Sequence, residues 1–149
     1  MSLMLLSLLL AGPMIPAHEL SKAAPVVQSG VRNIPVGDPL RRVLLDTLRT
    51  PVANELNQPV QFVVDALKIQ GDWAFYAGKV QRPDGGAIDF ARAGFAEQIA
   101  EGMFDGPATY GLMRRVGGRW TVVVYVIGPT DVAYVGWPGE YGAPETLFE

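Results

Sequence analysis

The sequence predicts an α+β fold: an N-terminal helix packed on a curved antiparallel sheet of about four strands (two hairpins), with a non-regular C-terminal strap. Three features indicate this fold. An amphipathic stretch begins at Asp38, two glycine-containing turns separate apolar runs, and the tail is rich in glycine, proline and aromatic residues. We expect residues 38–149 to form a single domain, because about 100–150 residues are enough for one buried core.

The helix begins with a strong start signal. Asp38 suits the N-cap, and Pro39 suits the first helical position, where its missing N–H costs nothing. Apolar residues then recur with helical spacing at Leu40, Val43, Leu44, Leu48, Val52 and Leu56. Because Pro51 interrupts this stripe, we expect a helix over 39–49 and a kinked or separate continuation to about Leu56.

The first hairpin is predicted over 60–82, around the two-residue turn Gly71-Asp72. Pairing about this turn places Leu67 opposite Tyr76, Val63 opposite Val80, and Ile69 opposite Ala74. The other face of the hairpin carries Lys68, Trp73, Phe75 and Lys79, a mixed set typical of a partly solvated surface.

The second hairpin is predicted over 109–127, around Gly117-Gly118, and it pairs Tyr110 with Tyr125. The run 122–127 is apolar at every position, which is typical of a central strand that is covered on both faces. The helix can cover one face only. The cover of the second face is left open between a short amphipathic helix over about 92–104, the C-terminal tail, and a second subunit.

The tail over 128–148 is expected to run as an ordered strap across one side of the sheet. Its aromatic residues are too large to leave in water unless something covers them, and Trp137 is the expected anchor. Four residues are the candidates for contact with a ligand or a protein partner: Trp137, Tyr141, Asp131 and Phe75.

The N-terminus is interpreted as a signal peptide over 1–23, followed by a linker or extended arm over 24–37. Residues 3–10 read LMLLSLLL, and two prolines follow at once. A signal-peptide core needs about 7–15 apolar residues, whereas a membrane-spanning helix needs about 20. We therefore expect a periplasmic or secreted protein with no stable membrane anchor after cleavage.

Composition excludes several kinds of site. The chain has no cysteine, and its one histidine, His18, lies in the expected leader. Thiolate metal sites, disulfides and cysteine catalysis are therefore excluded, and we expect neither a metal nor a cofactor. The net charge of −3 and the absence of a basic cluster give no electrostatic basis for binding nucleic acid.

One acidic and phenolic pair is a weak catalytic candidate. Asp65 lies in an apolar strand, and the expected pairing puts it on the same face as Tyr76. A buried carboxylate beside a phenol can abstract a proton next to a carbonyl group. Single buried acids also serve structural roles, and that is the interpretation we favour.

The order of elements, with GDWAFYAG at 71–78 and GGRWTVVVYVIG at 117–128, resembles the cystatin-like and nuclear-transport-factor-like superfamily. That resemblance implies a curved sheet that wraps a helix. Residues 38–148 as a whole also resemble an uncharacterised family of bacterial exported proteins, which implies no activity.

Taken together, the sequence favours an extracytoplasmic, non-catalytic domain that binds a protein partner or a small ligand. Two alternatives stay open. One is a cofactor-free isomerase- or hydratase-like enzyme that uses Asp65, and the other is a self-associating structural subunit such as a homodimer.

Overall fold

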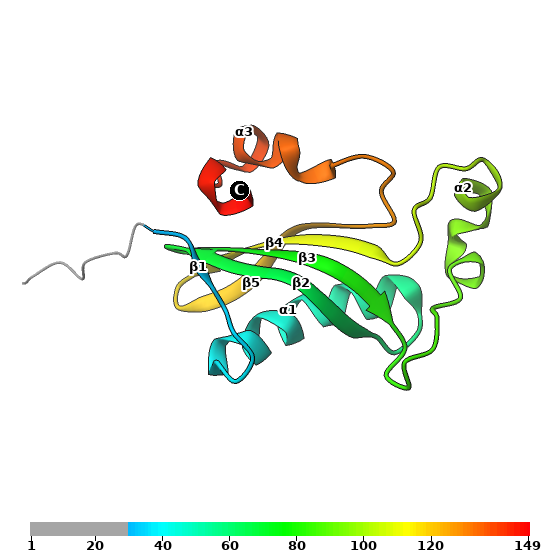
Figure 1. Cartoon of the computed structure of the whole chain (residues 1–149), viewed down its shortest axis with the longest axis horizontal. Helices are drawn as coiled ribbons and strands as arrows, with labels where there is room; N and C mark the ends of the chain where they lie inside the picture. The colour runs from blue at the N-terminus through cyan, green and yellow to red at the C-terminus, as the bar shows by residue number, and fades with distance from the viewer. Residues whose placement is uncertain (1–29) are drawn as a thin grey trace, which may run out of the picture.

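The computed structural model describes residues 30–149, so the expected signal peptide and the first part of the expected arm lie outside the described residues. The strands are β1 (Arg32–Asn33), β2 (Gln61–Gln70), β3 (Trp73–Gln81), β4 (Ala108–Val116) and β5 (Arg119–Ile127). The helices are α1 (Pro39–Leu56), α2 (Ala96–Ala100) and α3 (Trp137–Tyr141). The strands form one open antiparallel sheet in chain order, with α1 on one face and the C-terminal segment on the other (Figure 1).

Helix α1 starts and ends as expected and passes through Pro51 as one helix. The Leu40 N–H donates to the Asp38 side chain at 2.9 Å, and Pro39 is the first helical residue. A separate continuation is wrong, because α1 runs as one helix through Pro51 and ends at Leu56, where the end was expected. An internal proline costs about 3 kcal/mol. Burying the Val52 and Leu56 side chains, which are at most 1% exposed, contributes about 1.5–3 kcal/mol each and offsets that cost.

The first hairpin has the expected turn and half of the expected register. Leu67 pairs with Tyr76 and Ile69 with Ala74, which confirms the pairing near the turn. The pairing of Val63 with Val80 is wrong: Val63 lies opposite Lys79. Asp65 is an extra residue in β2, and this bulge moves every pair beyond it by one position.

The second hairpin repeats this outcome. Its Gly117-Gly118 turn is as expected, and both glycines have positive φ, 58° and 77°. A bulge in β5 at Val123 then shifts the register, so Tyr110 faces Val126 and not Tyr125. The two tyrosines consequently lie on opposite faces of the sheet.

The expected arm contributes to the sheet. β1 pairs with β2 at one edge, and the Ile34 N–H donates to the Leu67 carbonyl at 2.8 Å. Ile34 is only 3% exposed and belongs to the core under the sheet. The ordered domain therefore begins before Asp38, and the sheet has five strands where about four were expected.

The segment between the hairpins is less helical than expected over 92–104. Gly94 has a φ of 100°, which breaks the helical path, so that a turn at Ala91–Phe95 precedes the short helix α2. The aromatic rings of this segment make a small cluster, in which the ring centre of Phe104 lies 5.0 Å from that of Phe90 and 4.8 Å from that of Phe95. This segment stands at one end of the sheet and leaves the second face to the tail (Figure 1).

The C-terminal strap, residues 128–149, covers the sheet face opposite α1, as Figure 1 shows. It is ordered as expected, but it is not without regular structure. Short 3₁₀ turns at Ala133–Gly136 and Glu145–Phe148 flank the five-residue helix α3. Trp137 is 5% exposed and packs with Phe75 and Phe148 between strap and sheet. The tail is thus the cover of the second face that the sequence left open.

A candidate protein-binding edge

Strand β5 lies at an edge of the sheet. Within residues 30–149 it pairs with β4 alone, so the expectation of a central strand is wrong. Its two faces are nevertheless covered as those of a central strand would be. On the α1 side the core contains Trp120, Val122, Tyr125 and Ile127. On the strap side the second cluster contains Val123, Val124 and Val126.

The direction of the backbone groups along β5 follows from two observations. In an antiparallel ladder, alternate residues point N–H and C=O away from the paired strand. The residues next to the Gly117-Gly118 turn, Val116 and Arg119, bond to each other, so the backbone N–H and C=O groups of Trp120 and Val122 point away from β4. At the other end of β5 the Gly128 N–H donates to the Ala108 carbonyl at 2.7 Å. The backbone groups of Ile127 and Tyr125 therefore point away from β4.

The backbone groups of β2 alternate in the same way. Starting from the Gly71-Asp72 turn, this alternation points the Leu67 carbonyl away from β3. That carbonyl accepts the hydrogen bond from Ile34 of β1, as the alternation requires. Four residues of β5 therefore present unpaired backbone groups at the open edge: Trp120, Val122, Tyr125 and Ile127.

Edge strands usually carry devices that discourage pairing with other chains, such as charges, prolines or covering segments. The β2 edge has two of these, namely β1 over one half and the exposed Asp65 at its bulge. Residues 120–127 of β5 contain neither a charge nor a proline, and the bulge at Val123 is their one irregularity. This edge is suited to accept another strand.

Opposite charges mark the two ends of the β5 edge. Arg119 opens the strand beside the turn, and Asp131 follows shortly after its last residue. Both residues are exposed, and within the described part of the chain neither forms an ion pair.

The four residues expected to contact a ligand are not brought together at one surface. Phe75 and Trp137 are 3% and 5% exposed, and their rings lie 6.4 Å apart inside the strap cluster. Tyr141 packs against the same cluster and is half-buried. These three residues pack between the strap and the sheet, and Asp131 is the one of the four that is fully exposed.

Asp65 and Tyr76 do not form the buried acid–phenol pair that the sequence suggested. The expectation of a buried carboxylate is wrong, because the bulge at this position leaves Asp65 exposed. Tyr76 is fully buried, and its hydroxyl shares its hydrogen between the carbonyls of Lys79 and Val63, at 3.1 and 3.3 Å. Burial raises the pKa of Tyr76 well above its usual value, and the negative charge of Asp65 raises it further. The tyrosine therefore stays a neutral hydrogen-bond donor.

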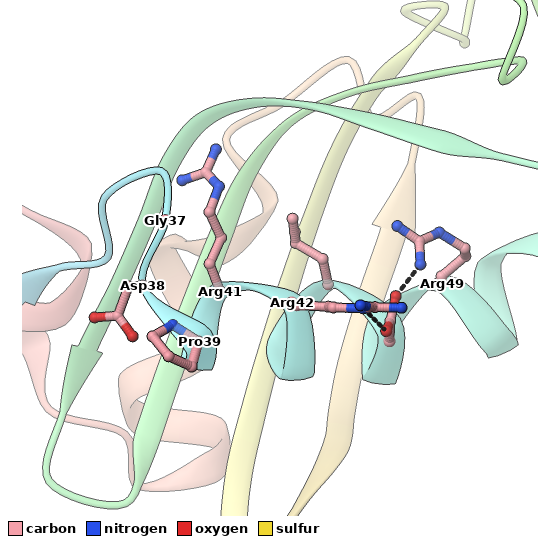
Figure 2. A pocket seen from close by; sticks show the side chains of 8 residues that line it. Gly37, Asp38, Pro39, Arg41, Arg42 and Arg49 are labelled. Carbon is pink, nitrogen blue, oxygen red and sulfur yellow. Dashed lines mark hydrogen bonds and ion pairs between the residues drawn. The ribbon is translucent and has the colours of Figure 1, made fainter.

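A hollow of about 570 Å³ lies beside the first turns of α1, and three arginines line it (Figure 2). All three arginines already bond to other groups of the chain. Arg42 and Arg49 both form ion pairs with Asp46, and Arg41 donates to the Ile34 carbonyl at 2.9 Å. The hollow is open to solvent. Arg41 ties α1 to the segment before it, and Arg42 and Arg49 pair within the helix.

A second hollow, of about 250 Å³, lies between Val63, Phe90 and Pro107. Pockets for small ligands usually have about 300–1,000 Å³ and several convergent polar groups. This hollow is smaller, and the one charged residue that lines it is Lys79.

Within residues 30–149 no three acidic, histidine or cysteine side chains are close enough to hold a metal ion. The helices of this part of the chain are all too short or too polar to cross a membrane. Comparisons with protein-family models, curated proteins and solved structures found no match to this chain.

The sequence predicts the strand β5 correctly but predicts a central position for it in the sheet, which is wrong. The apolar run 122–127 showed that both faces are covered, and from this a central position was inferred. A second signal was available, because a chain of consecutive hairpins places its last strand at an edge unless the sheet closes. Read together, the two signals would have pointed to the open edge of β5.

Proposed function

We propose that this protein is an extracytoplasmic, non-catalytic domain that binds an extended segment of a protein partner by adding it as a strand beside β5. One observation carries the proposal: a strand with the composition of a central strand lies at an open edge. In strand addition, backbone hydrogen bonds supply affinity, and the side chains next to them supply selectivity.

The geometry of the two covers supports this function. Because α1 and the strap hold the side chains of β5 on both faces, the edge keeps its shape before a partner arrives. A preorganised edge loses little conformational entropy on binding, which raises affinity for a given number of contacts. The half-buried valines, Val122, Val123 and Val124, would lose further water-accessible surface when a sixth strand is added.

Binding can be tested with a simple strand-forming probe, an alternating Thr-Val peptide with lysines at both ends. Dye-labelled protein is held at trace concentration while the peptide is titrated, so that self-association cannot compete. We expect saturable binding that weakens at least about tenfold in Val122→Pro, because proline removes an outward N–H and blocks the edge.

The matched control is Val64→Pro. Val64 is half-buried on the same face of the sheet as Val122 and, by the same alternation of backbone groups, points its N–H outward from β2. This variant should bind the peptide like the wild type. A peptide methylated at alternate backbone nitrogens should not bind. Equal affinity of the two proline variants, or no saturable binding by the wild type, would contradict the proposed function.

The extracytoplasmic location has a separate test. The short apolar run at 3–10 ends at prolines, and small residues follow at Ala17, Ser21 and Ala23. We expect cleavage between Ala17 and Ala24. Intact-mass measurement of the protein from its own host checks this, and an uncleaved species in the cytoplasm would refute it.

A further inference from the structure

We infer that the partner is a second copy of this chain, paired antiparallel through β5 about a twofold axis that passes between Val123 and Val124. The two sheets would then join into one continuous sheet. This inference rests on the proposed function of the β5 edge, and it names the strand that fits there. Two properties of β5 support it. One is the order of its faces, with which the direction of its backbone groups alternates in step, and the other is the pair of charges at its ends.

The faces of β5 match themselves in this register. An axis between Val123 and Val124 pairs residue i of one copy with residue 247 − i of the second copy. Directly opposite side chains then share a face of the joined sheet. Trp120 meets Ile127 and Val122 meets Tyr125, all of them on the α1 side. Val123 meets Val124 on the strap side.

The bulge selects this register. A strand with strict alternation matches its own faces about an axis through any residue, so several registers would fit equally well. Because the bulge puts Val123 and Val124 together on the strap side, all faces of β5 match only when the axis passes between these two valines.

The backbone groups match in the same register. Four residues of β5 have backbone groups that point away from β4, and in this register they pair only with one another across the two copies. Trp120 of one copy lies opposite Ile127 of the other, and Val122 lies opposite Tyr125. In an antiparallel ladder such outward pairs exchange two hydrogen bonds each. The twofold axis produces every pair twice, which gives about eight intermolecular hydrogen bonds.

The charges match as well. Antiparallel pairing brings the turn end of one β5 to the strap end of the other. Arg119 of one copy then lies beside the segment that leads from Gly128 to Asp131 of the second copy. Both charged side chains are exposed and have no ion-pair partner in the described part of the chain. Parallel pairing would instead place like charges together.

Sedimentation over a wide concentration range tests the inference on the protein as its host produces it. We expect a reversible monomer–dimer equilibrium. In Val122→Pro the dissociation constant should rise at least about tenfold, whereas Val64→Pro should leave it unchanged. In hydrogen exchange, the amides of Val122 and Tyr125 should become protected as protein concentration rises.

A charge exchange keeps the test independent of proline effects. Arg119→Asp and Asp131→Arg are exposed changes that should each weaken the dimer, at low salt most strongly. The double variant should recover at least part of the affinity, because exchanging both charges restores opposite signs across the twofold axis.

The outcomes separate this inference from the proposed function. A monomer at every concentration, or a dimer indifferent to Val122→Pro and to the charge variants, overturns self-pairing. If the Thr-Val peptide still binds at β5 in that case, strand addition stands and the partner is a different chain. If neither the peptide nor a second copy binds at β5, both proposals fail.

Discussion

Replacing Trp137 by alanine should lower the free energy of unfolding by about 3–5 kcal/mol, the range for removing a buried aromatic side chain. Trp137 is 5% exposed, and its ring lies within 6.3–6.4 Å of the ring centres of Phe75, Tyr134 and Phe148. Alanine would leave a cavity between the strap and the sheet that these rigid neighbours cannot fill. Urea unfolding followed by circular dichroism measures the change.

Two further variants make this test specific. Trp137→Phe keeps a ring at the site and should lose clearly less stability than Trp137→Ala. Val135→Ala changes a strap side chain that is 72% exposed, and it should lie within about 0.5 kcal/mol of the wild type. All proteins are compared at one concentration, because self-association would add to apparent stability. A loss below about 1 kcal/mol for Trp137→Ala would contradict an anchored strap.

Replacing Gly78 by alanine should destabilise the protein by about 3 kcal/mol, the upper part of the usual range for overpacking. A Cβ atom at this position would lie 2.1 Å from the Val63 carbonyl oxygen and 2.5 Å from the Tyr76 hydroxyl oxygen. The first of these is a backbone atom of the neighbouring strand and cannot turn away. The strands would have to separate beside the bulge at Asp65, and the hydrogen bond of Tyr76 would be lost.

Gly139→Ala is the matched control. A Cβ atom at Gly139 meets no heavy atom within 4 Å, and the residue lies in the short helix α3. Its stability should change by no more than about 1 kcal/mol, with alanine favoured in a helix. Unfolding midpoints from thermal melts compare the two variants. If Gly78→Ala were as stable as Gly139→Ala, the close approach of β2 and β3 at this point would be wrong.

These two sites connect stability to the proposed function. The strap held by Trp137 covers the side chains of Val123, Val124 and Val126, and α1 covers the other face of β5. Loosening the strap should therefore weaken binding at the β5 edge as well as stability. Gly78 lies in the central strand β3, opposite Val64 and beside the bulge of β2.

Much of the fold could be predicted because its signals are local. The Asp38-Pro39 start of α1 and the glycine turns at 71–72 and 117–118 depend on residues next to one another in the chain. The α+β arrangement follows from these elements, because an amphipathic helix must bury its stripe against a sheet face. The ordered aromatic strap followed in the same way from the cost of leaving large rings in water.

The errors share a cause, which is competition between contacts distant in the chain. Alternation along β2 and β5 contains no sign that Asp65 or Val123 is an extra residue, since a bulge is decided by the strands and layers packed around it. On local grounds Pro51 predicts a kinked or separate continuation of the helix, and the structure has one helix in place of two. The burial of Val52 and Leu56 against the sheet outweighed that preference.

By itself, therefore, the sequence determined the kinds of element, their turns and the two covered faces of β5, because composition and spacing carry that information directly. The tertiary structure alone decided that β5 ends the sheet and that its bulge puts Val123 and Val124 on the same face. Strand order and register depend on which long-range pairs form together, and no single segment of the chain encodes that choice.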